Sequence, residues 1–253
     1  MRIVVVMPCR NEGKHIGNLV RTLVDHGYSV IVSDDNSSDL TKDIAHTSGA
    51  SVIDSSMVKH HGYGSALRRG IQTAVKMYQP DVLVFMDGDG QHSPDDIANV
   101  LRPILHDKAD VVLGSRLGKQ DKRPYYKRLS NAFGTWIANV GASQKVTDAI
   151  TGYWAIRTNY LPVTTEKGWG ASFENLIKCR ADKARITSVP VHALWHSNLK
   201  DNSTLNPIML GIIVMWKIIK WRLICEVTPL RLSRWLGWQL HKRLVYPDYR
   251  KGG

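Results

Sequence analysis

The sharpest chemical signal in this sequence is a pair of carboxylates one residue apart, Asp87 and Asp89, with Gly88 between them. They follow the apolar run of residues 82–86, which predicts a buried strand. Two acids placed there can both turn toward one hard cation, and Mg²⁺ takes oxygen ligands that it shares with substrate phosphates. Asp and Gly also dominate ordinary turns, so the pair alone predicts a polar turn about as readily as a metal site.

Other polar clusters also follow apolar runs that predict strands. Runs of this kind alternate with helical spacing through the first half of the chain, and that order predicts an α/β fold with a mostly parallel, doubly wound sheet. Ligands of such sheets bind beyond the carboxyl ends of the strands. We therefore expect one crevice to gather the polar residues 10–12, 34–35, 87–92 and 115–116.

The elements that must position these residues are partly readable from local signals. Ser93, Pro94 and two following acids predict a helix start, with a serine cap and a proline in the first turn. The second half is less regular. It predicts helices at residues 125–141 and 173–180 and strands at residues 153–157 and 186–191.

Five motifs, in order, resemble those of the family 2 glycosyltransferases. Residues 8–12 (Pro-Cys-Arg-Asn-Glu), 34–39 (Asp-Asp-Asn-Ser-Ser-Asp) and 62–67 (Gly-Tyr-Gly-Ser-Ala-Leu) are similar to motifs of the whole family. Residues 87–94 and Gly-Ser-Arg at 114–116 are similar to its dolichol-phosphate mannose synthase branch, as is the weaker match at 148–153.

The resemblance implies a GT-A (Rossmann-like) fold, with the donor nucleotide over the first half of the sheet. It implies that a nucleotide-sugar contacts Pro8, Arg10, Glu12, Asp35, Asp87, Gly88 and Asp89, with Asp35 on the base. It also implies that Asp87, Asp89 and Gln91 coordinate Mg²⁺ or Mn²⁺ bridging the diphosphate. Arg10 stands where the family usually carries Tyr.

The predicted catalytic residues are Asp89, Arg116 and Asp148. Arg116 offers a planar, permanently charged fork for phosphate. The resemblance implies that an acceptor phosphate meets Arg116, Arg128 and Ser130. Asp148 and Glu174 are candidate general bases. A sugar hydroxyl needs such a base, whereas a phosphate monoester, with a second pKa of about 6, does not; the sequence leaves both acceptors open.

One region departs from the branch. After Pro190-Val191 the branch usually carries an arginine and a lysine that would meet phosphate. Here His196 and Thr204 occupy those positions, which weakens the expectation of a polyprenyl-phosphate acceptor.

The C-terminal part of the chain is basic. Of the formal charge of +12, residues 216–253 carry nine Lys/Arg against two acids. The apolar run at 207–216 falls short of the roughly 20 residues of a spanning helix. A leucine stripe at 232, 236, 240 and 244 opposite cations predicts a helix lying in a membrane interface, with packing on the catalytic domain as the alternative. We therefore predict a GT-A domain at 1–205 and a basic, amphipathic, membrane-associating tail at 206–253.

The predicted activity is inverting transfer of a hexose from a GDP- or UDP-sugar to a polyprenyl or dolichyl phosphate. The enzyme would be cytoplasmic, in peripheral contact with an anionic membrane. Transfer to a hydroxyl of a lipid- or protein-linked glycan is the first alternative, and a non-enzymatic membrane or nucleic-acid binding module is the second. Nucleic acid is not an expected partner, because the tail has no recognised binding module. Three cysteines without metal-like spacing suit a reducing compartment.

Overall fold

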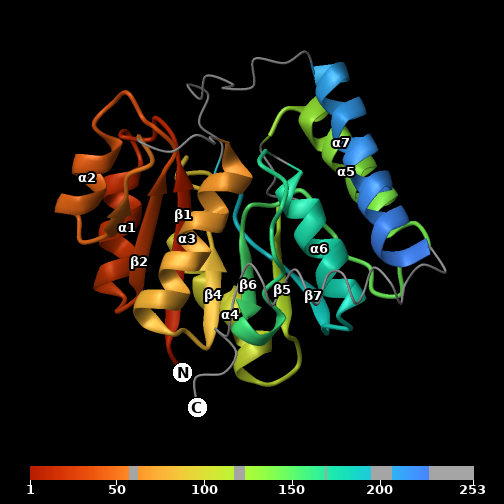
Figure 1. Cartoon of the computed structure of the whole chain (residues 1–253), viewed down its shortest axis with the longest axis horizontal. Coiled ribbons are helices and arrows are strands. Elements are labelled where there is room, and N and C mark those ends of the chain that lie inside the picture. Colours follow the sequence, from red (N-terminus) through yellow and green to blue (C-terminus); the bar gives the residue numbers. More distant parts are fainter. Residues whose placement is uncertain (57–61, 117–122, 169, 195–206, 228–253) are drawn as a thin grey trace.

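The computed structural model describes residues 1–56, 62–116, 123–168, 170–194 and 207–227. A seven-stranded sheet in the order β3-β2-β1-β4-β6-β5-β7 forms its centre (Figure 1). All neighbouring strands are parallel except β6, which runs antiparallel to both β4 and β5. The mostly parallel sheet is therefore confirmed. The strands are β1 Ile3–Cys9, β2 Ser29–Asp34, β3 Ser51–Ile53, β4 Val82–Phe85, β5 Val111–Ser115, β6 Trp154–Arg157 and β7 Ile186–Pro190.

Seven α-helices within the described residues surround the sheet. The serine-proline signal is confirmed: the Ser93 side chain accepts from the Asp95 amide, and Pro94 opens a 3₁₀ turn that leads into α4. The helix α2 was not predicted. The helices are α1 Ile16–Asp25, α2 Thr41–Thr47, α3 Tyr63–Tyr78, α4 Ile97–Leu105, α5 Tyr125–Asn139, α6 Ala171–Ala181 and α7 Pro207–Arg222, with short turns η1 Pro94–Asp96, η2 Thr158–Tyr160 and η3 Leu223–Val227.

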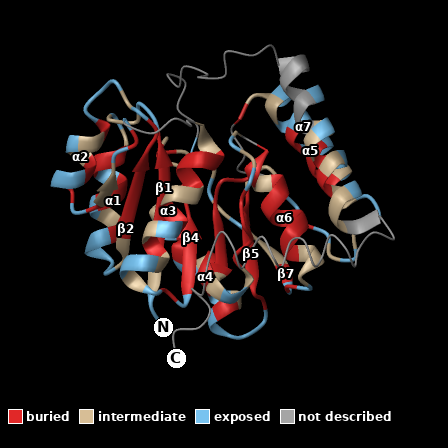
Figure 2. Ribbon diagram, viewed as in Figure 1, coloured by how far each residue is buried: buried red, intermediate tan, exposed pale blue. Residues whose placement is uncertain are grey.

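Two apolar clusters cover the two faces of the sheet. Alternate residues of β1 divide between them: Val4 and Val6 pack with α3 and α6, whereas Val5 and Met7 pack with α1 and α4. The inner strands β1, β4 and β5 are consequently buried on both faces (Figure 2), which is why their sequences are mostly apolar. This rigid layer fixes the position of every strand end.

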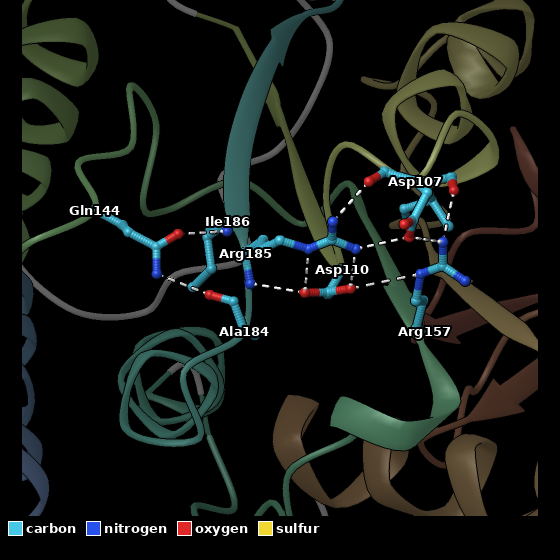
Figure 3. Close-up of polar contacts among 8 residues, drawn as sticks. Asp107, Asp110, Gln144, Arg157, Ala184, Arg185 and Ile186 are labelled. Atoms are coloured by element: carbon cyan, nitrogen blue, oxygen red, sulfur yellow. Dashed lines mark hydrogen bonds and ion pairs between the residues drawn. The ribbon is translucent and has the colours of Figure 1, made fainter.

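The two edges of the sheet have different roles. At the amino ends of β5 and β7, Asp110 accepts from Arg185 at 2.9 and 3.0 Å, and Arg185 and Arg157 also reach Asp107 (Figure 3). These residues hold the loops of that edge together. The carboxyl ends of β1, β2, β4 and β5 lie at the other edge, where the predicted site residues are found.

The helix α7 packs against α5 and α6 (Figure 1). Lys217 and Lys220 both bind Glu166, the latter at 2.9 Å. Within the described part of the chain, no helix has the length and apolar character needed to cross a bilayer. The predicted leucine-striped helix lies in residues 228–253, outside the described residues, and the domain boundary after residue 205 stays a prediction.

Candidate active site

The acidic pair occupies the turn that follows β4. Gly88 is buried against β1, so closely that a Cβ at this position would lie 2.4 Å from the sulfur of Cys9. Asp87 and Asp89 on either side of it are half-buried. Only a residue without a side chain fits between them, and this close approach holds both acids at the edge of the sheet.

Gly152, just before β6, packs directly on the carboxylate of Asp87. A Cβ at Gly152 would lie 1.9 Å from Asp87 Oδ2 and 2.5 Å from Oδ1. This contact exists because β6 is antiparallel and so begins at the edge where β4 ends. The motif at residues 148–153 thus supplies one wall of the acidic site.

Asp89 is oriented by Gln91. The backbone amide of Gln91 donates to Asp89 Oδ1 at 2.9 Å, and its side-chain amide donates to Oδ2 at 2.7 Å. The structure therefore shows Gln91 as a partner of Asp89, and its role as a third metal ligand stays a prediction.

Excess negative charge collects at this edge. Burial, together with the charges of Asp89 and Asp87, raises the pKa of Glu12 to about 8. Burial and the charge of Asp87 also raise the pKa of Asp89. Such shifts mean that three ionised carboxylates are unfavourable here without a compensating cation.

A buried atom without a partner points the same way. Asp87 Oδ1 has no hydrogen-bond partner among the described residues. Those residues include no group of three or more His, Cys, Asp or Glu side chains arranged as a metal site. Two acids with an open coordination sphere fit Mg²⁺ or Mn²⁺, because Mg²⁺ is usually held by one or two carboxylates plus substrate phosphates.

Two aromatic side chains beside Asp87 were not predicted as site residues. Burial and the nearby charge of Asp87 raise the pKa of Tyr63 well above its ordinary value. Buried His92 places Nε2 3.7 Å from Asp87 Oδ2 and packs on the ring of Tyr153. Both residues lie inside the motifs at 62–67 and 87–94, so the sequence marked these segments but did not predict that their side chains lie beside Asp87.

Arg116 and Asp148 form a bidentate ion pair. Arg116 donates from Nε to Oδ2 at 2.9 Å and from Nη2 to Oδ1 at 3.2 Å. Asp148 is fully buried and also accepts from Asn131 of α5 at 3.0 Å. Burial alone would raise the pKa of Asp148, but the adjacent Arg116 outweighs burial and lowers it.

Arg116 also links this pair to the acidic site. The charges of Asp148, Asp87 and Asp89 overcome the effect of burial and raise the pKa of the Arg116 guanidinium. The predicted catalytic residues are thus within electrostatic reach of one another. The arrangement gives Asp148 the role of holding Arg116, and its predicted role as a general base stays a prediction.

Four of the seven predicted nucleotide residues lie at the end of β1 or on the loops after β1 and β2, which are hydrogen-bonded to each other. Asn11, in a left-handed conformation with φ of 58°, accepts from the Ser38 amide, and the Glu12 amide donates to Thr41. Pro8 is buried in β1, whereas Arg10 is exposed beyond it. The loops after β1 and β2 therefore form a single wall of the site.

Asp35 joins this wall to α3. Its carboxylate accepts from the Gly62 amide at 2.6 Å and from Arg69 at 3.1 Å. The structure thus shows Asp35 anchoring the start of α3, and its predicted hydrogen bond to a nucleotide base stays a prediction.

The other two predicted acceptor residues and the second base candidate lie on the helices α5 and α6 rather than at the strand ends. Arg128 and Ser130 are exposed on α5. Buried Glu174 accepts from the Thr165 and Glu166 amides and from Lys178, so its carboxylate holds the loop before α6. His196 and Thr204 lie outside the described residues.

Comparison with known proteins places the chain among glycosyltransferases. The family model described as glycosyl transferase family 2 matches residues 4–163. The UDP-N-acetylglucosamine–dolichyl-phosphate N-acetylglucosaminyltransferase of Methanococcus voltae is 29% identical over 86% of this chain and 94% of its own. The dolichol-phosphate mannosyltransferase of Pyrococcus furiosus is 26% identical over 79% of this chain and 60% of its own.

Solved structures share the fold. Glucosyl-3-phosphoglycerate synthase from Mycobacterium tuberculosis superposes with a TM-score of 0.67 and 23% identity, covering 90% of this chain and 81% of that one. This likeness identifies the sheet and its helices as the GT-A fold. The chain therefore belongs to glycosyl transferase family 2, in the branch that resembles dolichol-phosphate mannose synthases.

Proposed function

We propose that this protein transfers a hexose, with inversion, from a GDP- or UDP-sugar to a polyprenyl or dolichyl phosphate. The transfer would take place at the cytoplasmic face of a membrane with which the protein is in peripheral contact. The observation that carries the proposal is the acidic site of Asp87, Asp89 and Glu12 with Arg116 in electrostatic reach. That arrangement suits a metal-bound diphosphate beside a second phosphate.

The acidic site supports the donor half of the proposal. Asp87 and Asp89 would hold Mg²⁺ or Mn²⁺. The mycobacterial glucosyl-3-phosphoglycerate synthase, which shares the fold, has a crystal structure in complex with Mn²⁺ and UDP. A bound cation supplies positive charge where the departing nucleoside diphosphate gains negative charge. Gly152 packs on the Asp87 carboxylate and Gln91 binds that of Asp89, so both metal-binding carboxylates would be oriented before substrate binds.

The engagement of both base candidates favours a phosphate acceptor. A hydroxyl acceptor needs a carboxylate that takes its proton, yet Asp148 is paired with Arg116 and Glu174 with Lys178. A phosphate monoester is largely ionised at neutral pH and needs no such base. The names of three relatives, from Methanococcus voltae, Pyrococcus furiosus and Micrococcus luteus, specify dolichyl-, dolichol- and undecaprenyl-phosphate.

Arg116 would meet the acceptor phosphate. Asp148 holds the guanidinium through two hydrogen bonds, which leaves its remaining N–H groups for phosphate oxygens. Bringing two phosphate groups together is otherwise repulsive. A fixed cation between them lowers that repulsion in the transition state.

The donor is tested by thermal unfolding with UDP and GDP, each with and without Mn²⁺. We expect one nucleotide to raise the melting temperature in a Mn²⁺-dependent manner, because a ligand of the folded state stabilises it by mass action. In the Asp89→Asn variant, the Mn²⁺-dependent part of the rise in melting temperature should be lost. Absence of a shift with either nucleotide would overturn the donor assignment.

The acceptor is tested with labelled UDP- and GDP-sugars and a polyprenyl phosphate in detergent. We expect a lipid product that mild acid cleaves, as a glycosyl phosphate bond requires. Transfer that occurs only to a preformed glycan would reject the phosphate acceptor and support the hydroxyl alternative.

A further inference from the structure

The helices α5 and α7 each expose a stripe of large apolar side chains. On α5 the stripe has the spacing 4, 3, 4, with Leu129, Phe133, Trp136 and Val140 exposed by 57, 53, 62 and 49%. On α7 and the first residue of η3 the same spacing recurs in Ile212, Trp216, Ile219 and Leu223, exposed by 57, 65, 37 and 48%. Residues at this spacing lie on one side of a helix.

The two helices lie side by side at one end of the molecule (Figure 1). Arg222 of α7 donates to the Ile137 carbonyl of α5 at 3.2 Å, which fixes one helix on the other. Tyr125 and Tyr126 extend the apolar surface at the start of α5, with exposures of 76 and 55%. We call these ten residues the apolar face.

The cations that interrupt the apolar sequence of α7 do not lie on the apolar face. Lys217 and Lys220 bind Glu166, which is largely buried, and the indole N–H of Trp221 donates to the same carboxylate at 3.1 Å. Ile218 on this side is fully buried. Lys217 and Lys220 thus bend toward an acid of the domain, while Trp216 and Ile212 of the same helix point to solvent.

Charge identifies the partner. Neither Tyr125–Asn139 nor Pro207–Arg222 contains an acidic residue, while Lys127 and Arg128 lie beside the apolar face on α5. A second copy of the same surface would bring like charges together. An anionic bilayer supplies the complementary charge, and Trp, Tyr and Phe are the side chains that favour its interface.

We propose that the apolar face of α5 and α7 is the surface with which this protein lies on an anionic lipid bilayer. The proposal rests on the proposed function and deepens it, because α5 also borders the active site. The inner side of α5 carries Asn131, which bonds Asp148, and Thr135, which accepts from the Ala149 amide at 3.0 Å. One helix thus separates the bilayer from the Arg116–Asp148 pair, and a lipid phosphate would reach that pair along it.

Vesicle flotation tests the surface without donor or acceptor. The vesicles are phosphatidylcholine with and without phosphatidylglycerol, and the variant is Phe133→Glu combined with Trp216→Glu. The matched control is Met77→Glu combined with Leu105→Glu, whose side chains are exposed by 57 and 53% on α3 and α4. We expect the first variant to lose binding to anionic vesicles by about tenfold or more and the control to bind as wild type.

Three results would overturn the proposal. Wild-type protein that does not float would reject it outright. Equal binding by wild type and the Phe133/Trp216 variant would assign membrane contact to another part of the chain. A wild-type dimer that becomes monomeric in this variant, measured by analytical ultracentrifugation without lipid, would make the face an interface between copies.

Two further measurements separate this proposal from the proposed function. The nucleotide-dependent thermal shift of the variant should equal that of wild type, which also shows that it is folded. Transfer to a short-chain, water-soluble prenyl phosphate should be unchanged, while transfer to a long-chain acceptor in vesicles falls. Flotation without transfer to any acceptor would reject the function and leave the surface standing.

Discussion

At the scale of single residues, the position of Asp87 depends on the absence of a side chain at Gly152. We expect Gly152→Ala to displace the carboxylate, because the new Cβ would overlap it. The Mn²⁺-dependent thermal shift with nucleotide should then be lost. Gly168→Ala is the control, since its Cβ would meet nothing within 4 Å. An unchanged shift in Gly152→Ala would show that Asp87 is not needed in its present position.

The Asp148→Asn variant tests whether Asp148 positions Arg116 or acts as a general base. Removing its charge leaves Arg116 buried without its partner, and breaking a buried pair costs about 3–5 kcal/mol. We expect Asp148→Asn to lower the free energy of unfolding by that amount, measured with urea, and to raise the KM for the acceptor more than it lowers kcat. Full stability with only kcat reduced, and a pH profile lacking its acidic limb, would identify a general base instead.

Glu12 makes the stability of the metal-free protein depend on pH. Its pKa of about 8 in the folded protein exceeds the ordinary value of 4.5, so the folded state binds the proton more tightly. The contribution is complete below about pH 4.5, and it is lost as pH rises toward about 8. Urea unfolding across this range should show that Glu12→Gln removes part of the wild-type decline. Parallel curves for the two proteins would contradict the prediction.

At the scale of elements, Glu166 connects α7 to the domain. Its carboxylate receives Lys217, Lys220 and the Trp221 indole, and its backbone carbonyl lies where a Cβ on Gly64 of α3 would be. Because both lysines are partly exposed, we expect Glu166→Gln to cost about 1–2 kcal/mol, less than a fully buried pair.

Hydrogen exchange and urea unfolding measure this effect. In the Glu166→Gln variant, amide protection should fall more in α7 than in the sheet. Lys42→Ala, which removes an exposed pair with Asp54, is the control and should leave stability nearly unchanged, because solvent screens such a pair. Equal protection of α7 in wild type and Glu166→Gln would show that apolar packing alone holds the helix.

At the scale of the whole molecule, the net charge of +12 should make membrane binding depend on salt. Screening shortens the Debye length from about 10 Å at 0.1 M to about 3 Å at 1 M salt. We expect flotation with anionic vesicles to weaken over this range without vanishing, because the apolar face is not screened. Complete loss at high salt would show that charge alone drives the contact.

The sequence by itself determined the mostly parallel sheet and the place of the polar clusters after its strands. Continuous apolar runs predicted buried parallel strands, and the polar clusters after them predicted the edge where the acids gather. These signals are local in the chain, since a strand and the loop after it are contiguous. The roles of Tyr63, His92 and Gly152 could not be predicted, because each meets Asp87 only through the packing of separate elements.

Only the tertiary structure decided the direction of β6, the pairing of Arg116 with Asp148, and the side of α7 that faces outward. Each depends on contacts between residues far apart in the chain: Arg116 meets Asp148 across 32 positions, and Lys217 meets Glu166 across 51. Along the sequence, Lys217 and Lys220 interrupt an apolar run. In the fold both bind Glu166, and the exposed apolar side chains of α7 lie on the helix next to α5.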